Sequence, residues 1–147
     1  MTPDGPARPY EILSVEDNPG DVRLIHEAFR ETQISCALRT VRDGADAMRY
    51  LHRQDPWTSA AKPDLIILDP TIPKKDGCEV LQEVKAHPGL RRIPVVVTTS
   101  DAPRDVTRAY DLFANCYVSK SADLDEFLST VCTIGSFWLS TVKLPLE

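Results

Sequence analysis

The chain has 147 residues, of which 42% are hydrophobic and 27% charged, and its formal net charge is −5. This length suits one domain with a substantial core, and the composition is that of a globular rather than a disordered protein. The net negative charge argues against extensive electrostatic binding to nucleic acid or anionic lipid. No apolar run approaches the roughly 20 residues of a membrane span.

The first residues lack the apolar segment and the cleavage pattern of an export signal. We therefore expect a cytoplasmic protein in which residues 1–9 form a disordered lead. Its cysteines are widely spaced and have no partner at metal-ligand spacing, so reduced, buried thiols are expected. These cysteines are Cys36, Cys78, Cys116 and Cys132.

Short apolar runs alternate with segments of helical period along the chain. A predicted strand at 10–15 is followed by a helix from Pro19 to about Thr32, with Asn18 as N-cap. A strand at 36–41 and a helix at 45–51 come next, then a polar, proline-bounded loop at 54–63. The run LIIL at 65–68 is apolar throughout, as expected of a central parallel strand buried on both faces.

The second half of the chain continues the alternation. A helix is predicted at 78–86, a strand opening at 94–97, and a helix around 106–113. A last strand at 116–119 precedes a helix at 124–134. Five such units predict an α/β fold with a doubly wound, five-stranded parallel sheet and helices on both faces. Right-handed crossovers then bring the carboxyl ends of all strands to one edge, where ligands bind in such folds.

Polar residues close four of the predicted strands and would meet at this edge. Glu16 and Asp17 end the first strand, Asp69 the third, Thr99 the fourth and Lys120 the fifth. Carboxylates at close range repel one another, and a hard divalent cation with oxygen ligands relieves the repulsion. Magnesium fits best, because it accepts one or two carboxylates together with a phosphoryl oxygen. The sequence therefore predicts a Mg²⁺ site.

An aspartate beside such a cation is a plausible nucleophile toward phosphorus. Phosphoryl transfer requires little beyond in-line positioning and charge stabilisation. Mg²⁺ and Lys120 would balance the transferred oxygens, and the Thr99 hydroxyl would donate a hydrogen bond to them. The sequence therefore predicts that Asp69 accepts a phosphoryl group.

Four segments resemble the response regulator receiver domain: VEDNPGDVRL, DLIILDPTIPKKDG, RIPVVVTTSDA and NCYVSKS. The resemblance implies a flavodoxin-like receiver fold over residues 10–135 with strand order 2-1-3-4-5. It also implies a signalling protein rather than an enzyme, with self-catalysed phosphoryl transfer and slow autodephosphorylation. The implied roles are phosphoacceptor for Asp69, metal ligands for Glu16, Asp17, Asp69 and the Thr71 backbone carbonyl, switch residues for Thr99 and Tyr117, and a phosphoryl-contacting lysine for Lys120.

The long loop before the third strand, the PKKDG turn and the ending FWLSTVKLP are similar to the single-domain regulators of phytochrome-type histidine kinases. This resemblance implies a histidine kinase of the phytochrome type as partner. It also implies an output through protein contacts or through phosphate transfer to another relay protein. Thr71 and Asp101 correspond to positions that tune the lifetime of the phosphoryl group. No DNA-binding domain is expected to follow.

Three residues depart from the family pattern. Pro70 follows the acceptor and lacks an amide donor, while Ser14 and Thr98 place hydroxyls where apolar residues are usual. Two interpretations remain open: tolerated substitutions, or an altered phosphorylation lifetime in a partly degenerate receiver. The alternative function is a phosphorylation-independent interaction module. A haloacid-dehalogenase-type phosphatase is disfavoured, because Thr71 stands where that chemistry needs a second aspartate.

Residues 136–147 form a predicted C-terminal extension. Its apolar side chains, among them Phe137, Trp138 and Leu139, need cover, and large exposed apolar patches usually mark interfaces. A homodimer through the C-terminal half is therefore expected. The alternative is a tail that folds back over its own domain.

Overall fold

A computed structural model describes residues 8–99, 103–120 and 123–145, with the backbone alone at Thr99 and Pro103. Five strands alternate with five helices, and a short π-helix follows the last of them. The elements are β1 (Tyr10–Val15), α1 (Pro19–Glu31), β2 (Cys36–Val41), α2 (Gly44–Leu51), β3 (Leu65–Leu68), α3 (Gly77–Ala86), β4 (Val95–Thr99), α4 (Pro103–Asp111), β5 (Cys116–Ser119), α5 (Leu124–Ser136) and η1 (Phe137–Thr141).

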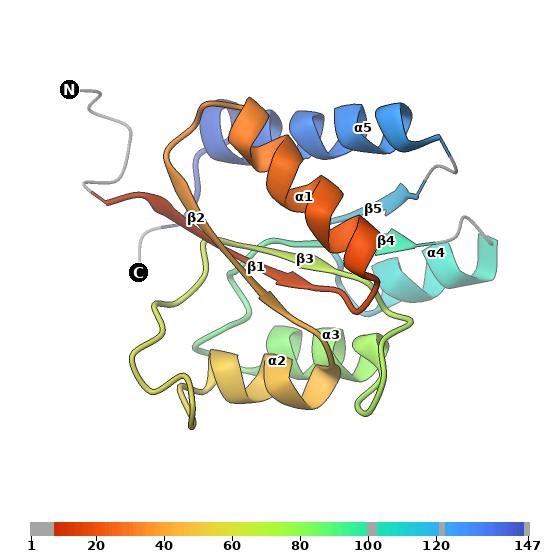
Figure 1. Ribbon diagram of the computed structural model, residues 1–147. Coiled ribbons are helices and arrows are strands. Elements are labelled where there is room, and N and C mark those ends of the chain that lie inside the picture. Colours follow the sequence, from red (N-terminus) through yellow and green to blue (C-terminus); the bar gives the residue numbers. More distant parts are fainter. Residues whose placement is uncertain (1–7, 100–102, 121–122, 146–147) are drawn as a thin grey trace.

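The strands form one parallel sheet in the order β2-β1-β3-β4-β5, as predicted (Figure 1). Val15 of β1 pairs with Leu68 of β3, and Leu68 pairs with Val97 of β4. The three central strands therefore end at nearly the same level. This register brings the residues that follow them to one edge of the sheet.

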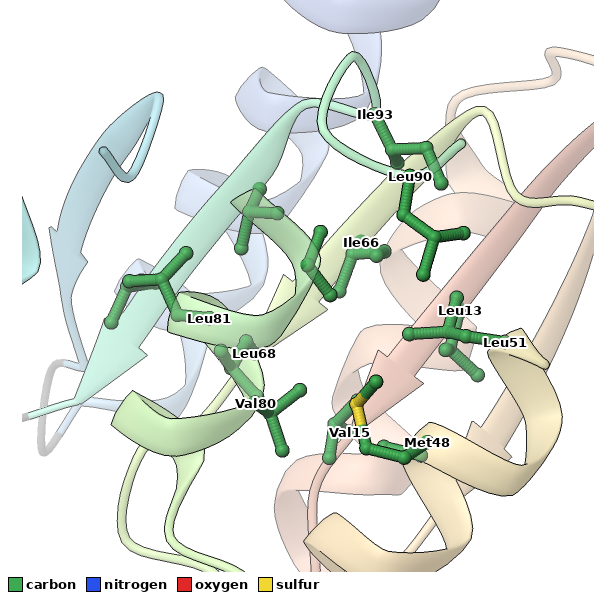
Figure 2. Packing of buried hydrophobic residues seen from close by; sticks show 14 of the residues in the cluster. Leu13, Val15, Met48, Leu51, Ile66, Leu68, Val80, Leu81, Leu90 and Ile93 are labelled. Atoms are coloured by element: carbon green, nitrogen blue, oxygen red, sulfur yellow. The ribbon is translucent and has the colours of Figure 1, made fainter. Parts of the chain in front are cut away.

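Each face of the sheet carries its own apolar core. Helices α1 and α5 cover one face, while α2 and α3 cover the other (Figure 1). On the α2–α3 face, side chains from β1 and β3 interdigitate with those of the two helices (Figure 2). On the α1–α5 face, Phe29 and Phe127 lie among the buried strand residues. The central strand β3 is buried along its whole length, which explains its unbroken apolar run.

Asx residues begin four of the helices. The side chains of Asn18 and Asp43 accept hydrogen bonds from the backbone N–H groups of Asp21 and Asp46, respectively. The carboxylate of Asp76 caps α3 in the same way, and Asp123 caps α5. Such caps satisfy amides that the first helical turn leaves without partners, so local sequence defines where each helix starts.

The predicted helix around 106–113 ends earlier than its apolar spacing indicates. Helix α4 stops at Asp111, and Phe113 lies beyond it with φ of 70° and a side chain that is 73% exposed. Tyr110 is also 48% exposed, whereas Ala109 and Ala114 are buried. The prediction that Phe113 belongs to the apolar face of a helix is therefore wrong. A left-handed turn moves its side chain outward and returns the chain to β5.

The C-terminal extension continues directly from α5 into η1. Leu139 is buried, and Trp138 and Leu144 pack against the core on the α1–α5 face. The described part of the tail thus folds back over its own domain, although Phe137 remains 48% exposed.

Trp57, in the loop after α2, packs against the core on the opposite face. Its ring centroid lies 5.9 Å from that of Tyr50.

The departures from the family pattern have distinct structural outcomes. Pro70 lies two positions beyond the end of β3, so its missing N–H interrupts none of the pairings of that strand. Ser14 and Thr98 are each only 1% exposed, and neither hydroxyl has a hydrogen-bond partner among the described residues. A buried hydroxyl without a partner destabilises a protein by roughly 1–3 kcal/mol, and this cost applies at both positions.

All four cysteines are free and partly exposed, so the thiols are unpaired as expected but less buried than predicted. None of the helices in the described ranges is long and apolar enough to cross a membrane.

Candidate functional site

The residues that end β1, β3 and β5 meet at the carboxyl edge of the sheet. The ammonium of Lys120 lies 2.6 Å from Glu16 Oε1 and 2.7 Å from Asp69 Oδ2. Glu16 and Asp69 are 1% and 4% exposed, and both are held beneath the edge of the sheet. The predicted convergence of these three residues is thus present in the structure.

Lys120 has a third partner that the sequence did not indicate. Its Nζ donates to Asp21 Oδ2 at 2.9 Å, from the first turn of α1. Asp21 is 99 positions away along the chain, and it lies here because α1 starts at the edge where β1 ends. The sequence offered one signal for this contact: Asp21 lies in the first turn of a helix that begins at this edge of the sheet.

The second carboxylate oxygen of Asp69 is also fixed. Asp69 Oδ1 accepts hydrogen bonds from the backbone N–H of Thr71 at 2.9 Å and from its hydroxyl at 2.8 Å. The other oxygen of Glu16 accepts from the backbone N–H of Asn18 at 3.2 Å. These contacts hold one oxygen of each carboxylate, while the other oxygen of each accepts from the same Lys120 ammonium.

The two buried acids respond differently to this environment. Burial raises the pKa of Glu16 to about 7, aided by the charge of Asp69 and opposed by the hydrogen bond from Lys120. Burial acts in the same direction on Asp69, but Lys120 and Thr71 together outweigh it and lower the pKa of Asp69. Desolvation opposes the charge of Lys120, yet its three carboxylate partners raise the pKa of the ammonium. Asp69 is therefore ionised near neutral pH, as a nucleophile requires.

Glu16, Asp17 and Asp69 offer ligand oxygens that all lie within 4.8 Å of one another. Asp17 is exposed, whereas the other two are buried, so the group faces solvent on one side. Hard oxygen donors with open coordination positions suit Mg²⁺, which retains several waters. The residues present therefore fit the predicted metal.

A small cavity of about 120 Å³ adjoins the acceptor between α3 and α4. Pro70 and Thr71 line one side of it, and Tyr117 lines another. The Tyr117 backbone N–H donates to the Tyr110 hydroxyl at 3.2 Å. The predicted switch aromatic thus lies beside the acceptor loop. Thr99 ends β4 at the expected edge, while its hydroxyl and the whole of Asp101 lie outside the described part of the chain.

The fold and this cluster together define a flavodoxin-like receiver: a doubly wound sheet with an acidic group and a lysine at its carboxyl edge. Residues 12–132 match the family model of the response regulator receiver domain. The chain therefore belongs to the response regulator receiver domain family.

Among its relatives is Response regulator Rcp1 of Synechocystis sp., which is 47% identical over 138 residues, covering 93% of this chain and 94% of the relative. The crystal structure of the phosphorylated cyanobacterial phytochrome response regulator RcpA is 48% identical, with a TM-score of 0.90 over 95% of this chain and 100% of that one. The Mn²⁺-bound form of Rcp1 also has a TM-score of 0.90, at 46% identity, covering 94% of this chain and 100% of that chain.

Proposed function

We propose that Asp69 accepts a phosphoryl group from the phosphohistidine of a sensor kinase. The observation that carries this proposal is the contact between the Lys120 ammonium and Asp69 Oδ2 at 2.7 Å, within a group of carboxylates suited to a divalent cation. A new P–O bond forms at the Asp69 carboxylate while the P–N bond breaks, and its electron pair stays on the imidazole nitrogen. Lys120 then balances the charge of the transferred oxygens.

The metal in this proposal is Mg²⁺. Glu16, Asp17 and Asp69 would hold it together with the backbone carbonyl of Thr71, and it would supply positive charge beside the transferred oxygens. The Thr99 hydroxyl would donate to the phosphoryl group, and Tyr117 would adjust its rotamer in response. Thr71 and Asp101 would tune slow autodephosphorylation.

Labelling by acetyl phosphate with Mg²⁺ tests the acceptor directly. The parent should incorporate acid-labile phosphate, and Asp69→Asn should lose it entirely. Asp76→Asn is the matched control, because Asp76 is a nearby carboxylate that caps α3 and an asparagine also caps helices. Undiminished labelling of Asp69→Asn would refute the assignment of Asp69 as the acceptor.

Asp17→Ala should weaken Mg²⁺ binding in calorimetry. An unchanged affinity for Mg²⁺ would remove Asp17 from the metal site.

The proposed phosphoryl donor is a phytochrome-type histidine kinase, and the support is the resemblance to Rcp1 and RcpA. The reaction would take place in the cytoplasm, where ATP is available to the kinase and thiols stay reduced. The output would be altered protein contacts or transfer of the phosphoryl group to another protein. The donor is tested by comparing the rate of phosphotransfer from a purified phytochrome-type kinase with the rates from a panel of unrelated histidine kinases. Equal rates from the unrelated kinases would contradict a phytochrome-type donor.

We also propose that the C-terminal extension at 136–147 contributes, through the exposed Phe137, to a homodimer interface on the α4–β5–α5 side. The exposed large apolar side chains of the described chain support this side, since all four belong to it. They are Tyr110, Phe113, Leu124 and Phe137. A stable dimer should bury more than roughly 1,000 Å² in total.

Light scattering tests this interface. The parent should have the mass of a dimer, and Phe113→Ser with Phe137→Ser should have that of a monomer. These variants are preferable to truncation of the tail, because Trp138 and Leu139 belong to the core of their own domain. A parent that stays monomeric at high concentration, with or without the phosphoryl group, would rule out the dimer.

A further inference from the structure

Lys120 has three ammonium donors, and the structure assigns each a carboxylate. The partners are Glu16 at 2.6 Å, Asp69 at 2.7 Å and Asp21 at 2.9 Å. An ammonium has three N–H groups and no acceptor, so this arrangement satisfies it fully. The Lys120 side chain is only 19% exposed. If any one partner is removed, one N–H donor of this largely buried cation loses its acceptor.

The three partners differ in what else they can do. Glu16 and Asp69 belong to the group of carboxylates close enough to share a cation, whereas Asp21 does not. A bound cation would compete with Lys120 for Glu16 and Asp69, and phosphoryl transfer would turn one Asp69 oxygen into the bridging oxygen of the acyl phosphate. Asp21 is the one partner whose contact with Lys120 is independent of the metal ligands.

Asp21 is also held in place through its backbone. Its backbone N–H donates to Asn18 Oδ1 at 3.1 Å, which fixes the first turn of α1 directly after the β1 edge. Its side chain is 23% exposed, so the pair with Lys120 is partly shielded from solvent. An ion pair of this kind is better defined than one on an open surface.

We propose that Asp21 is a positioning residue for phosphorylation: it holds the Lys120 ammonium over Asp69 when the metal and the phosphoryl donor engage the other carboxylates. This inference rests on the proposed function, because it assumes that Lys120 contacts the transferred oxygens. Preorganised charge at the reacting atoms stabilises a transition state more than charge that must first be oriented.

The test compares phosphorylation of Asp69 by acetyl phosphate in Asp21→Ala, Asp21→Asn and Asp46→Ala. Asp46 is the matched control, because its backbone N–H is capped by Asp43 as that of Asp21 is by Asn18, and its side chain pairs with Arg49. Asp21→Ala should lower the maximal rate on the order of tenfold. The half-saturating donor concentration should stay equal or fall, since a negative charge near an anionic donor has been removed. Asp46→Ala should keep the parent's rate.

Asp21→Asn retains an oxygen acceptor for Lys120, so it should recover most of the maximal rate. NMR of the Lys120 side-chain ammonium with Mg²⁺ present gives a second readout. Its ¹⁵N signal should be detectable in the parent and in Asp21→Asn, and broadened by solvent exchange in Asp21→Ala.

A maximal rate in Asp21→Ala equal to or above the parent's would overturn the positioning role. An equal loss in Asp21→Asn would also overturn it, because the effect would then follow the charge and not the contact. Labelling of the parent but not of Asp69→Asn shows in the same assay that the proposed function stands. A parent without labelling would instead refute both proposals.

Discussion

Gly77 lies so close to Pro70 that a Cβ on residue 77 would come within 2.3 Å of the Pro70 Cα. The same Cβ would lie 2.9 Å from the backbone oxygen of Asp69. The Gly77 N–H also donates to the Pro70 carbonyl at 3.1 Å. The first residue of α3 thus presses directly against the backbone that carries the acceptor.

Gly77→Ala should therefore destabilise the protein by about 1–3 kcal/mol, because the acceptor loop has to move. Gly20→Ala is the control, since within the described ranges its Cβ would approach only the flexible Asn18 side chain, at 3.3 Å. Urea unfolding of both variants provides the comparison. Equal stabilities would show that the loop yields without cost.

Thr98→Val should stabilise the protein by about 1 kcal/mol, because it replaces a buried hydroxyl that has no partner in the described chain with a methyl group of similar size. Thr40→Val should have the opposite sign, since the Thr40 hydroxyl lies 3.0 Å from His26 Nε2. Thermal and urea unfolding measure both. A loss of stability in Thr98→Val would mean that this hydroxyl has a favourable partner.

Lys85→Met should destabilise the protein by about 2 kcal/mol. The Lys85 ammonium donates to the carbonyls of Arg91 and Ile93 and to Asn115 Oδ1, and methionine satisfies none of them. Lys75→Met should cost less than about 1 kcal/mol, since Lys75 pairs with Glu83 near the surface. Chemical denaturation ranks the two, and a reversed order would contradict this account.

Stability should decline with falling pH partly because of His26. Burial, with the charge of Arg30, lowers the pKa of His26 below its ordinary 6.5. The folded state then binds the proton more weakly than the unfolded state. The contribution of His26 to the free energy of unfolding is therefore complete above about pH 6.5 and decreases as the pH falls below this value. The stability of the parent relative to His26→Gln should fall between pH 7.5 and pH 5 in urea titrations. Parallel profiles would exclude His26 as a cause.

Thr71→Asn should shorten the lifetime of phosphorylated Asp69 by about threefold or more. The Thr71 hydroxyl contacts the acceptor, and an amide there adds a donor and an acceptor that can orient an attacking water. Thr71→Ser retains the hydroxyl and should decay like the parent. The measurement is loss of acid-labile phosphate over time, and identical decay in Thr71→Asn would contradict the tuning role.

Residues whose position follows from strand ends were predictable. Glu16, Asp69 and Lys120 each follow an apolar run, and parallel pairing necessarily gathers such ends at one edge. Asp21 was missed because its contact depends on how α1 leaves β1, which spacing does not encode. Phe113 was misplaced for a related reason. Its apolar spacing fits a helix, whereas its positive φ depends on tertiary packing rather than on helical propensity.

The two tryptophans lie on opposite faces of the sheet: Trp57 against the α2–α3 core and Trp138 against the α1–α5 core. Each is therefore a natural fluorophore for one half of the molecule. Variants that keep a single tryptophan would report the melting of each layer separately. Coincident transitions would establish all-or-none unfolding, and separate ones would reveal an intermediate in which one layer persists without the other.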